Sequence, residues 1–251
     1  MKEALLRGRG LRKSFPGTQG AILDGVDVDI YAGDFTVVMG PSGAGKSTLL
    51  YALSGMDGVT DGEVLFQNQR ISGLPETEMA RLLACSFGFV FQQTHLVSNL
   101  TLFENVAVAG YVAHQRPPQE VERRALALLE QMGVGDARDR YPAQVSGGEE
   151  QRAAIARAMV NEPGLLFADE PTGALNKASS QEVLDLLTAL NRGGQSVLMV
   201  THDVRAALRG SRILYLEDGK LMDELTLEPY RPERAMERET QLNAWLSALR
   251  W

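Results

Sequence analysis

Nine consecutive residues near the start of the chain have the types and spacing needed to hold a chain of phosphates. The first eight of them fit the pattern G-x-x-x-x-G-K-[ST] of phosphate-binding loops. Glycines bring several N–H groups round an anion, because a residue without Cβ adopts φ values that others avoid. Lys46 adds a positive charge for the β and γ phosphates, and Ser47 adds a hydroxyl oxygen for Mg²⁺. The loop comprises Gly40, Pro41, Ser42, Gly43, Ala44, Gly45, Lys46, Ser47 and Thr48.

The segments on either side are of the kinds that position such a loop. Residues 35–39 are an apolar run that predicts a short buried strand, and residues 49–53 predict the first turns of a helix. The N-terminus of that helix adds a partial positive charge directed at the same anion. An ordinary glycine-rich turn is the alternative, and the flanking strand and helix argue against it. We therefore predict that the protein binds a nucleotide.

A second candidate lies where another apolar run ends in two carboxylates. Residues 165–168 predict a strand, and Asp169 and Glu170 follow it. In proteins with a phosphate-binding loop, an Asp in this place holds Mg²⁺. A following Glu is suited to orient and deprotonate a water that attacks the γ-phosphate. An apolar strand ending in Asp-Glu is common by itself, so this prediction depends on the loop.

A third candidate opens a predicted helix, at Ser146, Gly147, Gly148 and Glu149. Its simplest interpretation is a capping box, with Ser146 as the N-cap and Glu149 three residues later. Two glycines at a helix start also provide backbone donors that an anion can approach closely. Both interpretations can hold together.

The composition limits the class of protein. An apolar content of 44% and a charged content of 23% over 251 residues are typical of a globular protein. The single cysteine, Cys85, excludes an internal disulfide and favours a reducing compartment such as the cytoplasm. The net charge of −7 argues against nucleic acid and anionic lipid as direct partners. No apolar run approaches the ~20 residues that span a bilayer. We therefore expect any membrane role to depend on a protein partner.

The remaining pattern predicts the order of the elements. Alternating apolar and polar residues at 4–15 and 26–31 predict half-buried antiparallel strands, and residues 62–66 and 87–91 predict further strands. Residues 92–161 are of helical character, with a helix opened by Pro117-Pro118. After residue 164 strands and helices alternate as in βαβ units. This part comprises a helix at 178–190, a strand at 196–200, a hairpin turning at Asp218-Gly219, and a helical tail.

These motifs together resemble the nucleotide-binding subunit of an ATP-binding cassette (ABC) transporter, over nearly the whole chain. The family signature, usually Leu-Ser-Gly-Gly-Gln, is similar to residues 145–149 here. The resemblance implies that Phe15 stacks on adenine, that Gln92 reaches Mg²⁺ and the attacking water, and that His202 senses the γ-phosphate. It likewise implies a metal ligand at Asp169 and a catalytic base at Glu170.

The fold that this resemblance implies is α/β. We expect a P-loop NTPase with a RecA-like parallel-sheet core, an N-terminal antiparallel β subdomain and an inserted α-helical subdomain. Residues 1–91 and 162–230 would form the β subdomain and the core, residues 92–161 the helical subdomain, and residues 231–251 a C-terminal helical tail. The tail has an apolar helical face, for which packing on its own domain and contact with a dimer partner or permease are the two explanations.

The resemblance also implies partners. Two copies would sandwich two ATP molecules, each copy offering Ser146, Gly147, Gly148 and Glu149 to the ATP held by the other. The helical subdomain would grip an integral membrane permease, which places the protein at the cytoplasmic face of the inner membrane. Residues 88–92, 100–106 and 168–175 resemble one branch in particular. That branch contains lipoprotein-release, macrolide and antimicrobial-peptide exporters and the cell-division ATPase.

Two departures from the family pattern bear on the rate of hydrolysis. Asn176 stands where the family has an Asp that links the two sites of the dimer, and Glu149 and Glu150 stand where it has glutamines. A carboxylate turned toward a phosphate would repel it. We therefore expect hydrolysis that is slow or dependent on a partner.

Three other functions are compatible with parts of the pattern. A regulatory ATPase would use the same dimer to signal through a permease-like partner to envelope enzymes. A soluble cassette protein of DNA repair or translation is disfavoured by the acidic charge and the single cassette. A GTPase is disfavoured because residues 176–179 lack the Asp of a guanine-reading Asn-Lys-x-Asp.

Overall fold

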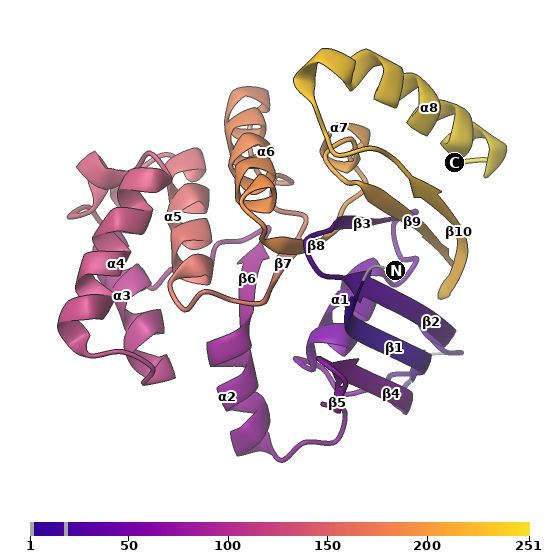
Figure 1. Ribbon diagram of the computed structural model, residues 1–251, viewed down its shortest axis with the longest axis horizontal. Helices are drawn as coiled ribbons and strands as arrows, with labels where there is room; N and C mark the ends of the chain where they lie inside the picture. Colours follow the sequence, from indigo (N-terminus) through magenta and orange to yellow (C-terminus); the bar gives the residue numbers. More distant parts are fainter. Residues whose placement is uncertain (1–2, 18–19) are drawn as a thin grey trace. The chain divides into compact units, whose positions relative to one another are not determined.

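The computed structural model describes residues 3–17 and 20–251, which form two compact units (Figure 1). The first unit joins Met1–Met79 to Asn191–Trp251, and the second consists of Ala80–Leu190. The first unit is therefore built from two distant stretches of the chain. Residues 1, 2, 18 and 19 of the predicted core lie outside the described residues.

One sheet of the first unit is antiparallel, in the order β2-β1-β4-β5. Its strands are β1 (Ala4–Lys13), β2 (Leu23–Tyr31), β4 (Asp61–Phe66) and β5 (Gln69–Arg70). Buried and exposed residues alternate along β1 and β2, which confirms the prediction of half-buried antiparallel strands. The predicted end of the first strand was wrong, because β1 ends at Lys13 and Phe15 lies in the loop beyond it.

The other sheet of the first unit surrounds the strand that precedes the phosphate-binding loop, in the order β10-β9-β3-β8. Its strands are β3 (Phe35–Met39), β8 (Ser196–Val200), β9 (Arg212–Glu217) and β10 (Lys220–Thr226). All five residues of β3 are buried, and β3 is parallel to both β8 and β9. Because Val38 lies opposite Val200, Gly40 and Thr201 come at the same edge of the sheet. The predicted hairpin is confirmed by the antiparallel pairing of β9 with β10.

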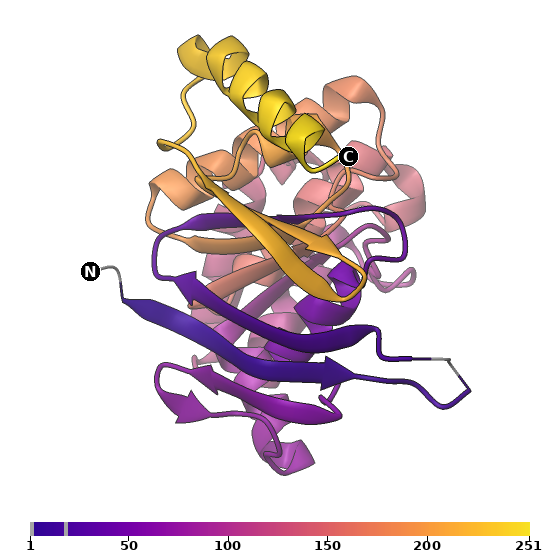
Figure 2. The same cartoon turned by 90° about the vertical axis from the view of Figure 1, so that its right-hand side faces the viewer.

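The described part of the first unit also contains helices. They are α1 (Lys46–Ser54), α7 (Val204–Ala207) and α8 (Ala235–Ala248), with a 3-10 turn at Pro232–Arg234. Figure 2 shows α8 and the β9–β10 hairpin of this unit as ribbons. Leu242 and Leu246 of α8 are buried, and the Trp245 indole N–H donates to the Asp223 carboxylate on β10 at 2.8 Å. Tyr215 of β9 contacts the Trp245 ring edge to face. The tail thus packs on its own unit.

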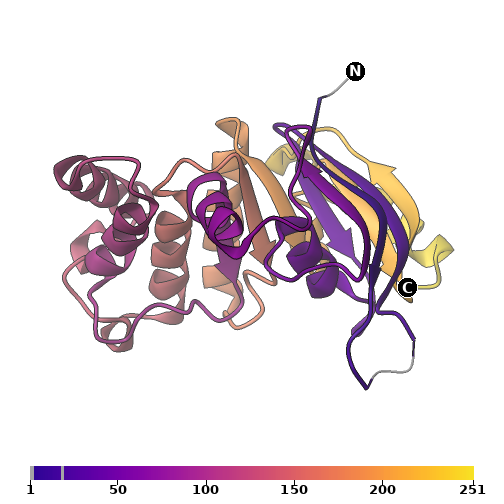
Figure 3. The same cartoon turned by 90° about the horizontal axis from the view of Figure 1, so that it is seen from below.

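The second unit combines two parallel strands with a group of helices. The strands are β6 (Phe87–Phe91) and β7 (Leu165–Asp169). The helices are α2 (Glu76–Ser86), α3 (Leu102–Ala113), α4 (Pro118–Gln131), α5 (Gly147–Met159) and α6 (Lys177–Arg192), with 3-10 turns at Gly135–Ala137 and Pro142–Gln144. Helices α3, α4 and α5 pack against one another, and α5 also packs against β6 (Figure 3). In the described part of the chain, no helix has the length and apolar character needed to cross a membrane.

The contact between α5 and β6 is close because β6 carries a glycine at the crossing. A Cβ built on Gly88 would lie 2.5 Å from the Ala158 carbonyl oxygen and 2.9 Å from Leu166 Cδ1. Those distances are shorter than van der Waals contact, so any larger residue forces the helix and the strand apart. Gly88 therefore sets how near α5 comes to the strand that leads to Gln92.

We expect Gly88→Ala to lower the free energy of unfolding by about 1–3 kcal/mol, because overpacking displaces backbone that cannot yield cheaply. Denaturant unfolding measures the change. Gly58→Ala is the matched control, since a Cβ there meets no atom within 4 Å, and its effect should stay within about 0.5 kcal/mol. Equal stabilities of the two variants would contradict a tight crossing.

Candidate functional site

Two glycines give the phosphate-binding loop its path between β3 and α1. A Cβ on Gly40 would lie 2.1 Å from the Leu216 carbonyl oxygen, so the chain passes this point only without a side chain. Gly45, the residue before α1, has φ of 98°, in the region that favours glycine, and a Cβ there would lie 2.8 Å from the Ile22 carbonyl oxygen. The predicted loop therefore forms one turn from the end of a buried strand to the start of a helix.

Lys46 lies inside this turn. Its side chain is buried, and its ammonium group donates to the carbonyl oxygens of Gly40 at 2.8 Å and Pro41 at 2.9 Å. Pro41, Ser42 and Gly43 are exposed. The loop thus has an exposed rim over a buried positive charge, which is an arrangement suited to an anion.

The tip of the β9–β10 hairpin supports the loop from the side. The Gly219 N–H donates to the Ala44 carbonyl at 3.2 Å, and the Asp24 N–H donates to the Gly219 carbonyl at 3.0 Å. Gly219 has φ of 73°, and a Cβ there would lie 2.4 Å from the Ile22 carbonyl oxygen. The sequence predicted this turn from Asp218-Gly219, but nothing in it indicated that the turn contacts the phosphate-binding loop.

His202 and Phe15 are both exposed residues of the first unit. The Thr201 N–H donates to the Val38 carbonyl at 3.1 Å, so His202 follows directly from the strand that neighbours β3. The next residue, Asp203, caps α7 by accepting from the Arg205 N–H. Phe15 is 40% exposed, with the Lys13 ammonium 4.9 Å from its ring centroid. Phe15 therefore lies in the loop after β1, with part of its ring exposed.

The second unit brings the predicted carboxylates and Gln92 together. Phe91 lies opposite Asp169 in the parallel pairing of β6 with β7, so Gln92 and Glu170 both follow at the same edge. A Cβ built on Gly173 would lie 2.9 Å from Gln92 Nε2, which places the Gln92 amide over the turn after Glu170. Glu170 itself has φ of 46°, an uncommon value for a residue with a side chain.

The signature residues begin α5 as a confirmed capping box. The Ser146 hydroxyl accepts from the Glu149 N–H, and the Glu149 side chain accepts from the Ser146 N–H. The helix is tied to β6 by the buried Gln151, whose amide donates to the Phe91 carbonyl at 2.9 Å. The signature helix and the start of the Gln92 loop are therefore fixed to each other.

Both glutamates that depart from the family pattern have partners within the second unit. Glu149 Oε2 accepts from the Ser146 N–H at 2.8 Å and from the Ser146 hydroxyl at 2.7 Å, and these bonds lower the pKa of Glu149. Glu150 accepts from the Thr94 hydroxyl, two residues beyond Gln92. The Ser146 hydroxyl proton is thus directed at a carboxylate of its own helix.

Asn176 has a structural role at the start of α6. Its side-chain oxygen accepts from the Ser179 N–H at 3.0 Å, which caps the helix. Gly148 lies next to the same turn, because a Cβ on it would be 2.7 Å from the Ser179 hydroxyl oxygen. The first turns of α5 and α6 are therefore neighbours, which the sequence motifs did not predict.

The side chains offer oxygen ligands for a metal. Residues 3–17 and 20–251 contain no group of three or more His, Cys, Asp and Glu side chains that could hold an ion by themselves. The predicted ligands are instead a hydroxyl, an amide and a carboxylate, from Ser47, Gln92 and Asp169. Hydroxyl, amide and carboxylate oxygens are each of the kind that Mg²⁺ takes, together with waters and phosphate oxygens.

Comparisons with known proteins agree with this arrangement. Residues 23–173 match the family model described as ABC transporter. The chain is 41% identical to the lipoprotein-releasing system ATP-binding protein LolD of Aquifex aeolicus, over 88% of this chain and 98% of that protein. It is also 41% identical to the macrolide export ATP-binding/permease protein MacB of Marinobacter nauticus, over 91% of this chain and 36% of that protein.

The structure is also similar to solved structures of ATP-binding cassettes. The fold is similar to a dimeric structure of the ATP-binding cassette MJ0796 in a post-hydrolysis state bound to ADP and phosphate. The TM-score is 0.82 at 35% identity, over 90% of this chain and 100% of that one. The expected α/β P-loop NTPase fold is confirmed.

The Glu149 cap makes a prediction about acid stability. A carboxyl group whose folded-state pKa lies below its ordinary value of 4.5 contributes stability above that pH, which is lost as the pH falls through the folded-state pKa. We expect the free energy of unfolding to fall less steeply between about pH 5 and about pH 3 in Glu149→Gln than in the unaltered chain. Ser146→Ala, which removes the hydroxyl donor, should lose part of the same pH dependence. Identical slopes would show that the cap does not depend on the charge.

Proposed function

This chain belongs to the ABC transporter family, and we propose that it is the ATP-hydrolysing subunit that powers a membrane permease. The observation that carries the proposal is the arrangement of Gln92, Asp169 and Glu170 at the end of two paired parallel strands. These are an amide, a carboxylate suited to a metal and a potential base, which are the groups that γ-phosphate chemistry uses.

In the first unit, we assign ATP binding to the phosphate-binding loop. Lys46 exchanges its two carbonyl partners for β- and γ-phosphate oxygens, which are charged and therefore stronger acceptors. The loop N–H groups and the N-terminus of α1 bind the same phosphates. Phe15 stacks on adenine, and His202 contacts the γ-phosphate.

In the second unit, we assign hydrolysis to Glu170, which orients the attacking water and takes its proton. Its position directly after β7 fixes the backbone from which the carboxylate projects. Asp169 and Gln92, with Ser47 of the first unit, are the residues that would hold Mg²⁺. That ion would neutralise phosphate charge as it develops.

We further propose that two copies close over two ATP molecules. The residues that cross to the partner's ATP are Ser146, Gly147, Gly148 and Glu149. They stand at the N-terminus of a 13-residue helix, where N–H groups and the helix dipole both favour an anion. The dimer reported for MJ0796 supports this assembly by similarity.

The partner that we propose is a MacB- or FtsX-like permease, gripped by residues 92–161. The names of the relatives, a lipoprotein-releasing system and macrolide exporters, support a substrate that is a peptide, a lipid-linked molecule or a lipoprotein. The matched part covers about a third of the macrolide relatives, whose names include a permease, and this supports a permease as the partner. Binding to it would hold the chain at the cytoplasmic face of the membrane.

One observation favours a regulatory ATPase as the alternative. The Ser146 hydroxyl donates to Glu149, so the signature must give up this bond before it can donate to a phosphate. Slow ATP hydrolysis of this kind is compatible with a regulatory ATPase as well as with a transporter. Reconstitution of the purified complex separates the two, because a transporter moves or extracts a solute whereas a regulator does not.

Glu170→Gln tests the assigned base. The amide keeps the shape of the side chain but cannot accept the proton, so we expect hydrolysis to fall by at least about 100-fold while ATP binding persists. Size-exclusion chromatography with MgATP should then detect a stable dimer. Lys46→Ala is the control, and it should neither bind ATP nor dimerise. A Glu170→Gln variant that stays monomeric with ATP and still hydrolyses it would refute the assignment.

Asn176→Asp tests communication within the dimer. A carboxylate can accept the same bond from the Ser179 N–H, so stability should change by less than about 0.5 kcal/mol. We expect the hydrolysis rate to depend more steeply on ATP concentration, because the restored charge would link the two sites. An unchanged rate profile would show that Asn176 serves only to cap α6.

A further inference from the structure

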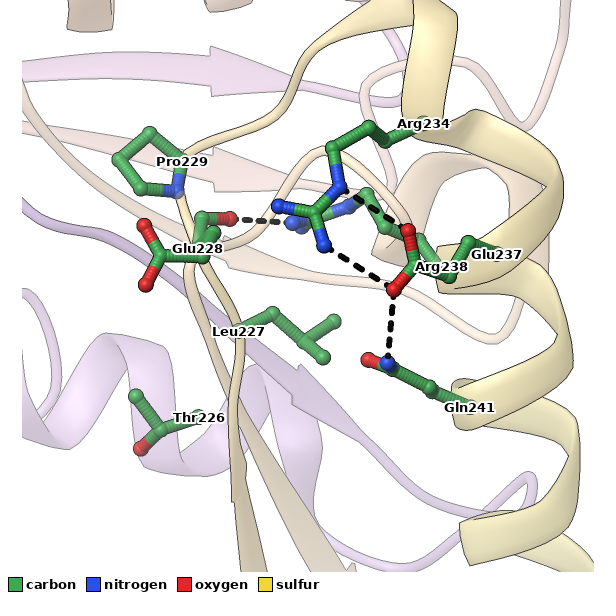
Figure 4. Close-up of a pocket in the computed structure, with 8 residues that line it drawn as sticks. All are labelled: Thr226, Leu227, Glu228, Pro229, Arg234, Glu237, Arg238 and Gln241. Carbon is green, nitrogen blue, oxygen red and sulfur yellow. Dashed lines mark hydrogen bonds and ion pairs between the residues drawn. The ribbon is translucent and has the colours of Figure 1, made fainter.

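A buried arginine in α8 is bonded to the segment that follows His202. Arg238 is 4% exposed. Its Nε and Nη2 donate to the Leu208 carbonyl at 3.1 and 2.9 Å, and Nη2 also donates to the Gly210 carbonyl at 2.5 Å. Nη1 donates to the Glu228 carbonyl (Figure 4). One guanidinium therefore joins the tail, the exit of α7 and the chain after β10.

The bonds of this group differ from those of an ordinary surface arginine. They end on backbone carbonyls, and burial lowers the pKa of Arg238, although a guanidinium remains charged in proteins. Hydrogen bonds from a charged donor are about twice as strong as neutral ones. Loss of the side chain would leave the buried Leu208 and Gly210 carbonyls without this donor, so Arg238 is placed to fix backbone positions.

Helix α7, which precedes the carbonyls bound by Arg238, is too short to be stable by itself. Helix α7 has only four residues, far fewer than an isolated helix needs to be stable. Its entrance is fixed by the bond from Thr201 to Val38, and its exit by Arg238 and by the Ser211 N–H, which donates to the Phe35 carbonyl at 2.9 Å. His202 lies between the entrance bond and the first turn of α7, so its orientation depends on both ends.

We propose that Arg238 is a positioning residue for His202. By holding the Leu208 and Gly210 carbonyls, it fixes the exit of α7 and keeps the imidazole where it can contact the γ-phosphate. This inference rests on the proposed function, since it assigns the tail a part in ATP hydrolysis. The tail would thus act on the chemistry without touching the nucleotide.

The tail provides its own matched control. Arg234 lies one helical turn before Arg238 and lines the same pocket of about 250 Å³ (Figure 4). It is half exposed and bonds to the Glu237 carboxylate at 3.0 Å rather than to α7. Arg234→Met therefore removes an arginine from the same pocket and leaves the α7 contact in place.

We expect Arg238→Met to lower kcat for ATP hydrolysis by at least about tenfold, because a displaced catalytic group loses far more than this for a shift of about 1 Å. The KM for ATP should stay within about twofold, since the phosphate-binding loop holds the nucleotide. Arg234→Met should match the unaltered chain. In a His202→Ala background, Arg238→Met should lower kcat no further. An equal loss in both backgrounds, or a rise in KM alone, would overturn the proposal.

A second measurement reports on His202 without hydrolysis. The chain has three histidines, so their ring protons can be followed separately by NMR. We expect Arg238→Met to shift the His202 signals and leave those of His95 and His114, in the other unit, unchanged. Arg238→Lys, which retains the charge and fewer donors, should shift them less and serves if the Met variant does not fold. Unchanged His202 signals in both would overturn the inference, whereas a lack of hydrolysis by the unaltered chain would count only against the proposed function.

Discussion

Parallel strand pairing is the constraint on which the rest of the molecule depends. Because parallel strands end at a common edge, residues that follow them meet without any pairing of their own. In the first unit, β3 lies between β8 and β9, which brings the phosphate-binding loop, Thr201 and the hairpin tip to one edge. In the second unit, the pairing of Phe91 with Asp169 does the same for Gln92 and Glu170. The pairing of these strands therefore determines which residues lie together at the edges where we propose that ATP is bound and hydrolysed.

The departures from the family pattern preserve local structure while changing charge. Glu149 completes a capping box, and Asn176 caps α6, so both serve the helix starts at which they stand. Glu150 and Gln151 bond to the Thr94 hydroxyl and the Phe91 carbonyl, on either side of Gln92. A substitution that was expected to repel phosphate is thus also part of the framework that holds the Gln92 loop. We therefore expect changes at these side chains to affect both the local structure and the rate of hydrolysis.

Local pattern predicted the fold better than it predicted the contacts that tune the site. The strands β3, β6 and β8 have the expected ends, since a mainly apolar run of five residues bounded by polar or glycine residues has the length of a strand rather than of a helix. The bonds of Arg238 to Leu208 and Gly210, and of Gly219 to Ala44, were not predicted. An arginine that bonds to distant carbonyls has no local signature, because every residue has a carbonyl. The first strand was predicted to continue to Phe15, whereas β1 ends at Lys13. The alternation of apolar and polar residues continues into the exposed loop, so the local pattern does not mark the end of the strand.

The divided first unit has a consequence for synthesis on the ribosome. Ala80–Leu190 is continuous, so the whole of the second unit leaves the exit tunnel before Asn191–Trp251. Strand β3 is made earlier, yet its partners β8 and β9 follow only after the whole of the second unit. A strand of five residues that are all buried in the fold, four of them apolar, must therefore remain unpaired together with the glycine-rich loop while more than a hundred codons are translated, at roughly 5–20 residues per second. During synthesis, β3 is therefore exposed for several seconds as a hydrophobic segment that a nascent-chain chaperone can bind.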